Sequence, residues 1–130
     1  MEIPDNLKYS KEHEWVRVEG NHAIVGITDF AQEQLGDIVH LELPGDGVSF
    51  EREDTVGVVE SVKSVSDIYA PMAGGIIEVN SVLLEDPAVI NQDCYGEGWL
   101  YKCSLKNKSE LNELMDAKQY KTYLEEEGYE

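Results

Sequence analysis

Residues 60–67 read Glu-Ser-Val-Lys-Ser-Val-Ser-Asp and are close to a palindrome about the bond between Lys63 and Ser64. A two-residue loop at this bond would place three pairs directly opposite one another on antiparallel strands: Val62 with Val65, Ser61 with Ser66, and Glu60 with Asp67. The favoured two-residue turns need positive φ, which neither loop residue readily supplies, and 55–69 could also form one long strand. The symmetry and the following Ala70-Pro71 favour the hairpin, with Lys63 at its tip.

Short strand-like segments separated by turn residues lie on both sides of this hairpin. Segments 14–18 and 22–27 flank Glu-Gly-Asn at 19–21, which predicts a second hairpin with a Gly-Asn turn. Segment 37–43 alternates, and one predicted face carries three apolar residues: Val39, Leu41 and Leu43. The other strand candidates are 48–50, 55–62, 65–69, 75–82 and 99–104. Many short strands at this spacing predict a mainly β fold, either a small barrel or a sandwich.

Helical patterns occur once inside the chain and again at its end. Thr28 as N-cap and Gly36 as C-cap bound a short internal helix. After Ser104 the composition shifts toward helix formers, which predicts a C-terminal helical segment at 109–127. Its expected caps and apolar residues are Ser109 with Leu111, Leu114 and Met115, then Asp116 and Gln119 with Tyr120, Tyr123 and Leu124. We expect these helices to pack over one side of the β structure.

The charge of the chain excludes some classes of partner. Its 27 Asp and Glu residues against 10 Lys and Arg give a formal net charge of -17. Such a chain repels phosphate backbones and anionic lipid headgroups, so we expect no nucleic acid and no membrane among its partners. From Val18 to Tyr101 there are 16 acidic residues and only two basic ones, Arg52 and Lys63. Lys63 is therefore an isolated cation on an acidic background.

No residue pattern points to catalysis or to metal binding. The histidines do not combine with Cys94 and Cys103 into a ligand pattern, and no nucleophile elbow, Walker loop or dinucleotide-binding glycine pattern is present. The N-terminus has neither a secretory nor a transit pattern, so we expect a cytoplasmic protein, or a matrix protein if this is a mature mitochondrial chain. At 130 residues we expect one domain over 1–130, with its core at 8–104.

The segment from Glu60 to Pro71, Glu-Ser-Val-Lys-Ser-Val-Ser-Asp-Ile-Tyr-Ala-Pro, resembles the lipoyl-attachment segment of the glycine cleavage system H protein family, with Lys63 at the modified position. Further segments match this family in order along nearly the whole chain: Glu12-His13-Glu14-Trp15-Val16, 26–32, 35–39, 41–45, 78–80, 90–91 and Tyr95-Gly96-Glu97-Gly98-Trp99. Three residues depart from the family pattern, namely His40, Ala73 and Cys94. None of them lies in the attachment segment.

This resemblance implies a lipoyl/biotinyl-type barrel-sandwich hybrid, a flattened barrel of two antiparallel sheets, that acts as a carrier and not as an enzyme. Lipoate would be attached to Lys63 by a lipoate ligase or by a lipoyl/octanoyl transferase. A glycine decarboxylase containing pyridoxal phosphate would load an aminomethyl group onto the arm. A tetrahydrofolate-dependent aminomethyltransferase would remove the one-carbon unit, and dihydrolipoyl dehydrogenase would reoxidise the arm.

The resemblance also implies roles for residues near Lys63. The surroundings of the attachment site comprise Glu60, Ser61, Val62, Ser64 and Asp67. Glu60 and Asp67 form an acidic frame for the attaching enzyme. Glu14 and Asp67 match positions that line a cleft for the loaded arm, although each could equally be an ordinary surface charge.

Several alternatives stay open to different degrees. A biotinyl carrier usually has methionines on both sides of its lysine, whereas Lys63 lies between Val62 and Ser64. The lipoyl domain of an oxoacid dehydrogenase is shorter and lacks both the Glu12–Trp15 segment and the C-terminal helices. A carrier of the same fold that relays lipoate to other enzymes needs the same lysine. Whether glycine decarboxylase and aminomethyltransferase accept the protein as a substrate would distinguish a carrier of the glycine cleavage system from a lipoate-relay carrier. An unmodified interaction domain is the alternative from a different class.

Overall fold

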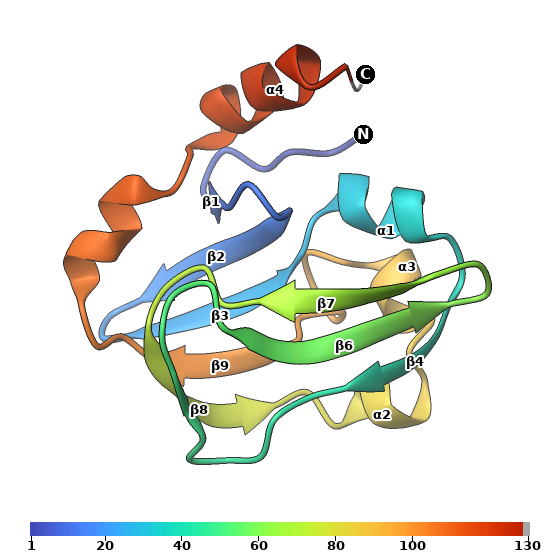
Figure 1. Ribbon diagram of the computed structural model, residues 1–130, viewed down its shortest axis with the longest axis horizontal. Coiled ribbons are helices and arrows are strands. Elements are labelled where there is room, and N and C mark those ends of the chain that lie inside the picture. The colour runs from blue at the N-terminus through green and yellow to red at the C-terminus, as the bar shows by residue number, and fades with distance from the viewer. Residues whose placement is uncertain (129–130) are drawn as a thin grey trace.

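Two antiparallel β-sheets form the centre of the computed structural model, which describes residues 1–128 (Figure 1). The strands are β1 (Lys8–Tyr9), β2 (Glu14–Glu19), β3 (His22–Ile27), β4 (Ile38–Glu42), β5 (Ser49–Phe50), β6 (Thr55–Ser61), β7 (Val65–Tyr69), β8 (Gly74–Val79) and β9 (Tyr101–Ser104). The larger sheet has the order β1-β2-β3-β9-β8-β5, and the smaller has the order β4-β6-β7. The predicted mainly β fold is confirmed; residues 129–130 of the expected domain lie outside the described residues.

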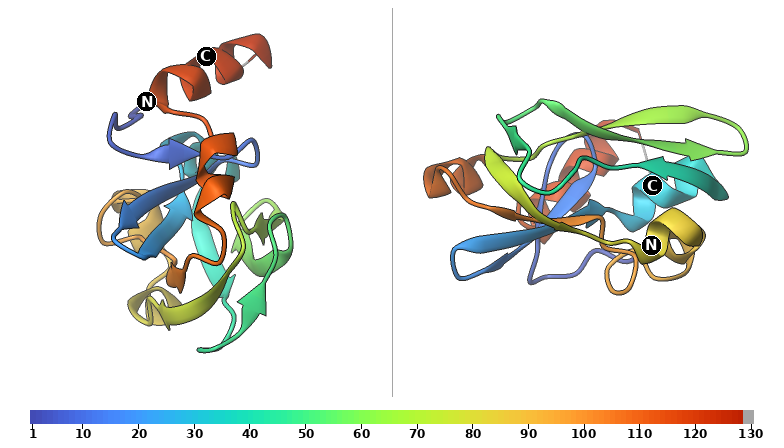
Figure 2. Two further views of the ribbon diagram at one scale, coloured as in Figure 1. Left: turned by 90° about the vertical axis from the view of Figure 1, so that its left-hand side faces the viewer. Right: turned by 90° about the horizontal axis from the view of Figure 1, so that it is seen from below.

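The helices lie at the margins of the sheets (Figures 1 and 2). They are α1 (Asp29–Leu35), α2 (Val82–Glu85), α3 (Val89–Gln92), the 3₁₀ helix η1 (Lys108–Glu113) and α4 (Ala117–Glu126). The predicted internal helix is α1, with Thr28 accepting from the Ala31 amide and with Gly36 as its C-cap. The short helices α2 and α3 and the strand β1 were not predicted, because each has too few residues for a periodic pattern to emerge.

The main core lies between the two sheets. It takes Val16 from β2, Val25 from β3 and Tyr101 from β9 on one side, and Val59 and Ile68 from the smaller sheet on the other. A second apolar cluster lies on the outer face of the larger sheet, where Tyr9, Trp15, Ile24 and Phe30 pack against Tyr120 and Leu124 of α4. Neighbouring residues on β2 therefore serve different cores, as the two-residue period of a strand requires.

The predicted hairpin at Lys63 is present, but its predicted register is wrong. Glu60 lies opposite Val65, and Asp67 lies opposite Val58, so a four-residue loop, 61–64, connects the last pair between these two strands. Ser61 still belongs to β6 because it pairs with Ile38 of β4. Neither Lys63 nor Ser64 has positive φ, which excludes the primed two-residue turns on which the palindromic pairing depended. Glu60 and Asp67 consequently do not face each other across the strands. The Gly-Asn turn of the other hairpin is confirmed, with Glu19 opposite His22 and with φ of +63° at Gly20.

The predicted faces of segment 37–43 are partly wrong. Val39 is 51% exposed, whereas Ile38 and Leu41 are each 3% exposed and belong to the main core. The pairing of β4 with β6 shifts between Ile38 and His40. A bulge of this kind inserts one residue and resets the alternation, which the sequence pattern alone does not reveal.

The predicted C-terminal helical segment 109–127 is interrupted. Asn107, and not Ser109, caps η1, while Asp116 and Gln119 form the predicted capping box at the start of α4. Between the two helices, Met115 exchanges backbone hydrogen bonds of 2.8 Å with Tyr9 of β1. This exchange fixes the position of α4 relative to the larger sheet. Within residues 1–128 no helix has the length and apolar character needed to cross a membrane.

Candidate functional site around Lys63

Lys63 lies in the four-residue loop between β6 and β7. The Ser61 amide donates to the Ser64 carbonyl at 2.8 Å, and the Ser61 hydroxyl oxygen accepts from the amides of Ser64 (3.1 Å) and Lys63 (3.3 Å). Ser61 is buried, whereas Val62 and Val65 are 70% and 66% exposed. One serine thus orders the backbone of the tip, and the side chains around the lysine remain accessible.

The Lys63 side chain lies over the end of α1. Its Cε is 3.4 Å from the position that a Cβ atom on Gly36 would occupy, and Gly36 has φ of +80°. The Val62 amide also donates to the Asp37 carbonyl at 3.0 Å, which ties the loop to the segment after α1. The absence of a side chain at Gly36 therefore leaves room for the lysine stem across the helix end.

A groove with a volume of about 310 Å³ lies beside the loop, between β7, α1 and the start of β2. Its apolar lining consists of Ile27, Phe30, Ala31, Leu35, Val59, Val65 and Ile68. Its polar lining consists of Glu12, His13, Glu14, Gln34, Ser64, Ser66 and Asp67. The structure thus brings Ser64, Asp67 and Glu14 to one groove, whereas Glu60 is not among the residues that line it.

Glu14 is a buried carboxyl group on the inner face of β2 and is 2% exposed. The Ser10 hydroxyl donates to Glu14 Oε1 at 2.5 Å, and the Tyr69 amide of β7 donates to Oε2 at 3.3 Å. Burial raises the pKa of Glu14 to about 7, because the charged form is desolvated. Glu14 is therefore not an ordinary surface charge, unlike the exposed Asp67. Its carboxyl group exchanges a proton near neutral pH.

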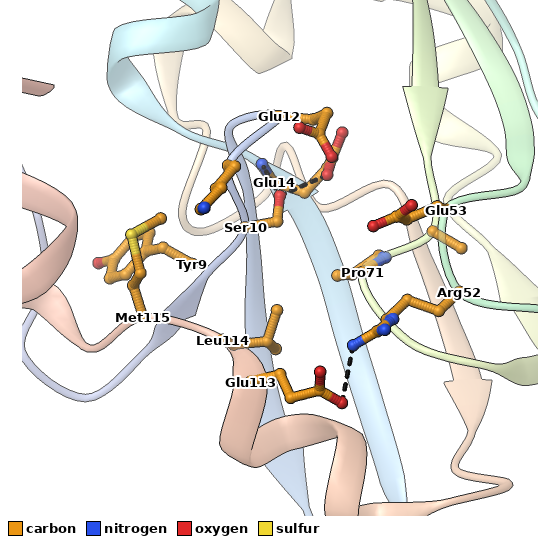
Figure 3. Close-up of a pocket in the computed structure, with 12 residues that line it drawn as sticks. Tyr9, Ser10, Glu12, Glu14, Arg52, Glu53, Pro71, Glu113, Leu114 and Met115 are labelled. Atoms are coloured by element: carbon orange, nitrogen blue, oxygen red, sulfur yellow. Dashed lines mark hydrogen bonds and ion pairs between the residues drawn. The ribbon is translucent and has the colours of Figure 1, made fainter. Parts of the chain in front are cut away.

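A second cavity of about 290 Å³ lies on the other side of Glu14 (Figure 3). Its lining includes Ser10 and Glu14, together with Arg52 and Glu113 at the far end. Arg52 Nη1 and Glu113 Oε2 are 2.8 Å apart, which links the loop after β5 to η1. Glu14 consequently lines both cavities.

Some residues of the site could not be identified from the sequence. Ser10 and the Tyr69 amide hold the Glu14 carboxyl group, and Gly36 accommodates the lysine stem. Gly36 was expected only as a helix cap, and Ser10 lies four residues before Glu14 without any pattern to single it out. Across residues 1–128, no group of three or more His, Cys, Asp or Glu side chains is arranged to hold a metal ion.

Two facing antiparallel sheets with an exposed lysine at a hairpin tip define the carrier domains of the lipoyl/biotinyl barrel-sandwich class. The crystal structure of a glycine cleavage system H protein from Mycobacterium marinum superposes with a TM-score of 0.85 at 39% identity, covering 97% of this chain and 99% of that one. The family model of the glycine cleavage H-protein matches residues 7–127. The chain belongs to the glycine cleavage H-protein family.

Curated relatives agree with this assignment over nearly their full length. The glycine cleavage system H protein of Carboxydothermus hydrogenoformans is 53% identical over 126 residues, covering 97% of each chain. That of Symbiobacterium thermophilum is 56% identical over 124 residues, covering 95% of this chain and 97% of the relative. The family resemblance and the fold class predicted from the sequence are confirmed. The chain is a non-catalytic lipoyl carrier of the glycine cleavage system, which links it to the other proteins of that system.

Proposed function

We propose that Lys63 Nζ carries lipoate in amide linkage, and that the groove between β7, α1 and the start of β2 receives the arm once it is loaded with an aminomethyl group. The observation that carries this proposal is the position of Lys63, which is exposed at a hairpin tip and directly beside the groove. An exposed amine at such a tip is accessible to an attaching enzyme without any unfolding of the domain.

The residues around Lys63 suit an amide-linked, largely apolar arm. Gly36 leaves space for the lysine stem, and the adjoining groove has an apolar lining that includes Phe30, Leu35 and Ile68. Its volume of about 310 Å³ lies at the lower end of the range for small-molecule pockets, roughly 300–1,000 Å³. The side chains present therefore fit a lipoyl group.

Lipoate, when attached, supplies a disulfide that is reduced as one of its sulfurs takes up the aminomethyl group. The amine of that group is a cation near neutral pH, and carboxylates stabilise a cation in a groove from which water is displaced. Glu14 supplies a buried carboxyl group and Asp67 an exposed one on the same groove. We assign them the binding of the ammonium group and, with the apolar wall, its protection from hydrolysis.

The partners of this cycle are glycine decarboxylase, aminomethyltransferase and dihydrolipoyl dehydrogenase. A lipoate ligase or a lipoyl/octanoyl transferase attaches the arm. With a net charge of -17, the carrier attracts basic docking surfaces on these enzymes, and modification of Lys63 removes one further positive charge. The named relatives are bacterial, which favours the cytoplasm over the mitochondrial matrix as its compartment.

Intact-mass spectrometry tests both parts of the proposal. With lipoate ligase, ATP and lipoate, the wild-type chain should gain one lipoyl adduct and Lys63→Arg none. Glu14→Ala should still be lipoylated, but after loading by glycine decarboxylase and glycine it should lose the aminomethyl group about tenfold faster, because a charged hydrogen bond is lost. Glu33→Ala removes an exposed carboxylate of α1 outside the groove and serves as the control. A lipoyl adduct on Lys63→Arg refutes the attachment site, and unchanged decay in Glu14→Ala refutes the protective groove.

A further inference from the structure

The C-terminal helix α4 contacts the segments around the groove through the hydroxyl of Tyr120. Tyr120 is fully buried, and its Oη lies 2.9 Å from His13 Nδ1 and 2.8 Å from Thr28 Oγ1. Its ring stacks on Tyr9 with centroids 4.7 Å apart and planes 5° from parallel. Tyr120 itself does not line the groove, so any effect on the groove is transmitted through its two partners.

The two partners of Tyr120 belong to two segments that meet at the groove. His13 lines the groove, and Thr28 caps α1, which supplies part of the groove's lining. His13 directly precedes Glu14 and has φ of +72°, a conformation that a non-glycine residue adopts only when surrounding contacts hold it. Thr28 caps α1, accepting from the Ala31 amide at 3.2 Å. The Thr28 amide in turn donates to the His13 carbonyl at 3.0 Å. Tyr120 thus completes a closed set of contacts that joins the loop carrying Glu14 to the N-terminus of α1.

The hydrogen bonds around the Tyr120 hydroxyl are mutually consistent. Tyr120 has one proton to donate and lone pairs to accept, so it donates to one partner and accepts from the other. Burial lowers the pKa of His13, which favours the neutral imidazole. With neutral His13 accepting at Nδ1, Tyr120 donates to His13 and accepts from the Thr28 hydroxyl. In the reverse direction, His13 donates to Tyr120 and Tyr120 donates to Thr28, which leaves the Thr28 proton without an acceptor among these groups, so the first direction is favoured.

A second tyrosine of α4 holds the same loop from outside. Tyr123, three residues after Tyr120, donates its hydroxyl to the Lys11 carbonyl at 3.0 Å. The two ends of the Ser10–Glu14 loop are also joined by a backbone hydrogen bond, since the Ser10 amide donates to the Glu14 carbonyl at 2.9 Å. The loop is therefore a rigid unit whose placement against α1 depends on α4.

We propose that Tyr120 is a positioning residue for the groove. By holding His13 and Thr28 together, it fixes the spacing between the Glu14 carboxyl group and α1, and thereby keeps the groove narrow enough to exclude water from the loaded arm. The C-terminal helix thus contributes to the lifetime of the loaded carrier without contacting the arm. This inference rests on the proposed role of the groove in protecting the arm.

The test compares decay of the loaded, full-length carrier in matched variants. Tyr120→Phe keeps the ring packing and removes the hydroxyl. It should shorten the lifetime of the aminomethyl group about fivefold, as expected for one lost hydrogen bond, and leave the rate of lipoylation at Lys63 unchanged. Leu124→Val weakens the packing of the same helix without touching a hydroxyl and should decay like the wild type. Equal acceleration in both variants, or in neither, would overturn the proposal.

A spectroscopic measurement on the unmodified protein supplies a readout independent of lipoate. Tyr120→Phe should shift the ¹⁵N resonance of His13 Nδ1, whereas Leu124→Val should leave it in place; an unchanged resonance in Tyr120→Phe overturns the proposal.

The decay of the loaded Glu14→Ala carrier distinguishes a failure of the protective groove from a failure of the role of Tyr120. Unchanged decay in Glu14→Ala would refute the protective role of the groove itself. Faster decay in Glu14→Ala together with wild-type decay in Tyr120→Phe removes only the role of Tyr120.

Discussion

The two hairpins β2–β3 and β6–β7 differ in what holds them. The β2–β3 hairpin has a two-residue loop with positive φ at Gly20, and its strands contribute to both apolar cores. The β6–β7 hairpin has a four-residue loop without positive φ, and three residues of β7, Val65–Asp67, are exposed. The first is fixed by the burial of both strands away from the turn, and the second is fixed near its tip by the Ser61 hydroxyl.

This difference matches two separate tasks of a carrier, which are to present a lysine and to support a groove. A hairpin that must present a lysine to several enzymes needs an ordered tip that makes few tertiary contacts. A hairpin that bears the groove carboxyl group needs a rigid frame. The two meet where the Tyr69 amide of β7 donates to Glu14 at the start of β2. Substitutions that disturb the β2–β3 hairpin should therefore change the free energy of unfolding. Substitutions at the tip of the β6–β7 hairpin should change the rate at which Lys63 is lipoylated.

The largest effect is expected at the contact between the two hairpins. The pKa of Glu14 is about 7 in the folded chain, against 4.5 for a free glutamate, so the folded state holds this proton more tightly. Well below pH 4.5 Glu14 is protonated in both states, and as pH rises toward 7 the unfolded state ionises first and is favoured. The free energy of unfolding of the wild type should thus fall by about 3 kcal/mol relative to Glu14→Gln between pH 4 and 8.

Urea unfolding of both proteins across this pH range measures the difference. Glutamine can accept from the Tyr69 amide and donate to Ser10, so the contact is retained without a titrating group. Glu12→Gln removes an exposed carboxylate from the same loop and controls for the loss of one negative charge. The same pH dependence in Glu12→Gln and Glu14→Gln would contradict burial as the cause.

A smaller effect is expected at the tip of the β2–β3 hairpin. A Cβ atom on Gly20 would meet no atom within 4 Å, so a substitution there tests the backbone conformation alone. Gly20→Ala should cost about 1 kcal/mol in the free energy of unfolding, because φ of +63° is unfavourable for alanine. Gly20→Asn should cost less, since asparagine tolerates this region. Equal urea midpoints for Gly20→Ala and the wild type would show that the loop relaxes.

The two hairpins also show where sequence analysis succeeds and fails. The Gly-Asn turn of β2–β3 was predicted correctly, and the observed register, with Glu19 opposite His22, follows from that two-residue turn. At Lys63 the palindrome favoured pairs that are displaced by two residues from the observed pairs. Because side chains alternate with a period of two, a displacement of two residues does not move any side chain to the other face of the sheet. The exposed position of Lys63 was therefore correct although its register was not.

Features that depend on distant segments were beyond the reach of local patterns. The capping box at Asp116 is local and was predicted. The burial of Glu14 depends on Ser10, on Tyr69 and on the closure of two sheets, and nothing adjacent to it indicates this. The contacts of Tyr120 with His13 and Thr28 likewise span 107 and 92 residues. The exposed position of Lys63 could thus be predicted from the sequence, whereas the geometry of the groove beside it could not.

The smallest effect on stability, and the most specific, is expected at the tip of the β6–β7 hairpin. Ser61→Ala removes the oxygen that accepts from the amides of Lys63 and Ser64. Ser61 is buried, but the two amides belong to exposed residues at which water can replace the lost oxygen, so the free energy of unfolding should fall by only about 0.5 kcal/mol. The orientation of Lys63 is lost nonetheless, and kcat/KM for lipoylation should fall about threefold, because a productive approach depends on a preorganised tip.

Two further variants isolate the hydroxyl of Ser61. Ser61→Thr keeps an acceptor at the same position and should restore the rate of lipoylation. Ser66→Ala removes an exposed hydroxyl that makes only a 3.4 Å contact with the Asp67 carbonyl, and should react like the wild type. A normal rate for Ser61→Ala would mean that the attaching enzyme orders the tip itself. In that case the ordering of the β6–β7 tip by Ser61 would have no effect on the rate of lipoylation, and the difference between the two hairpins would concern stability alone.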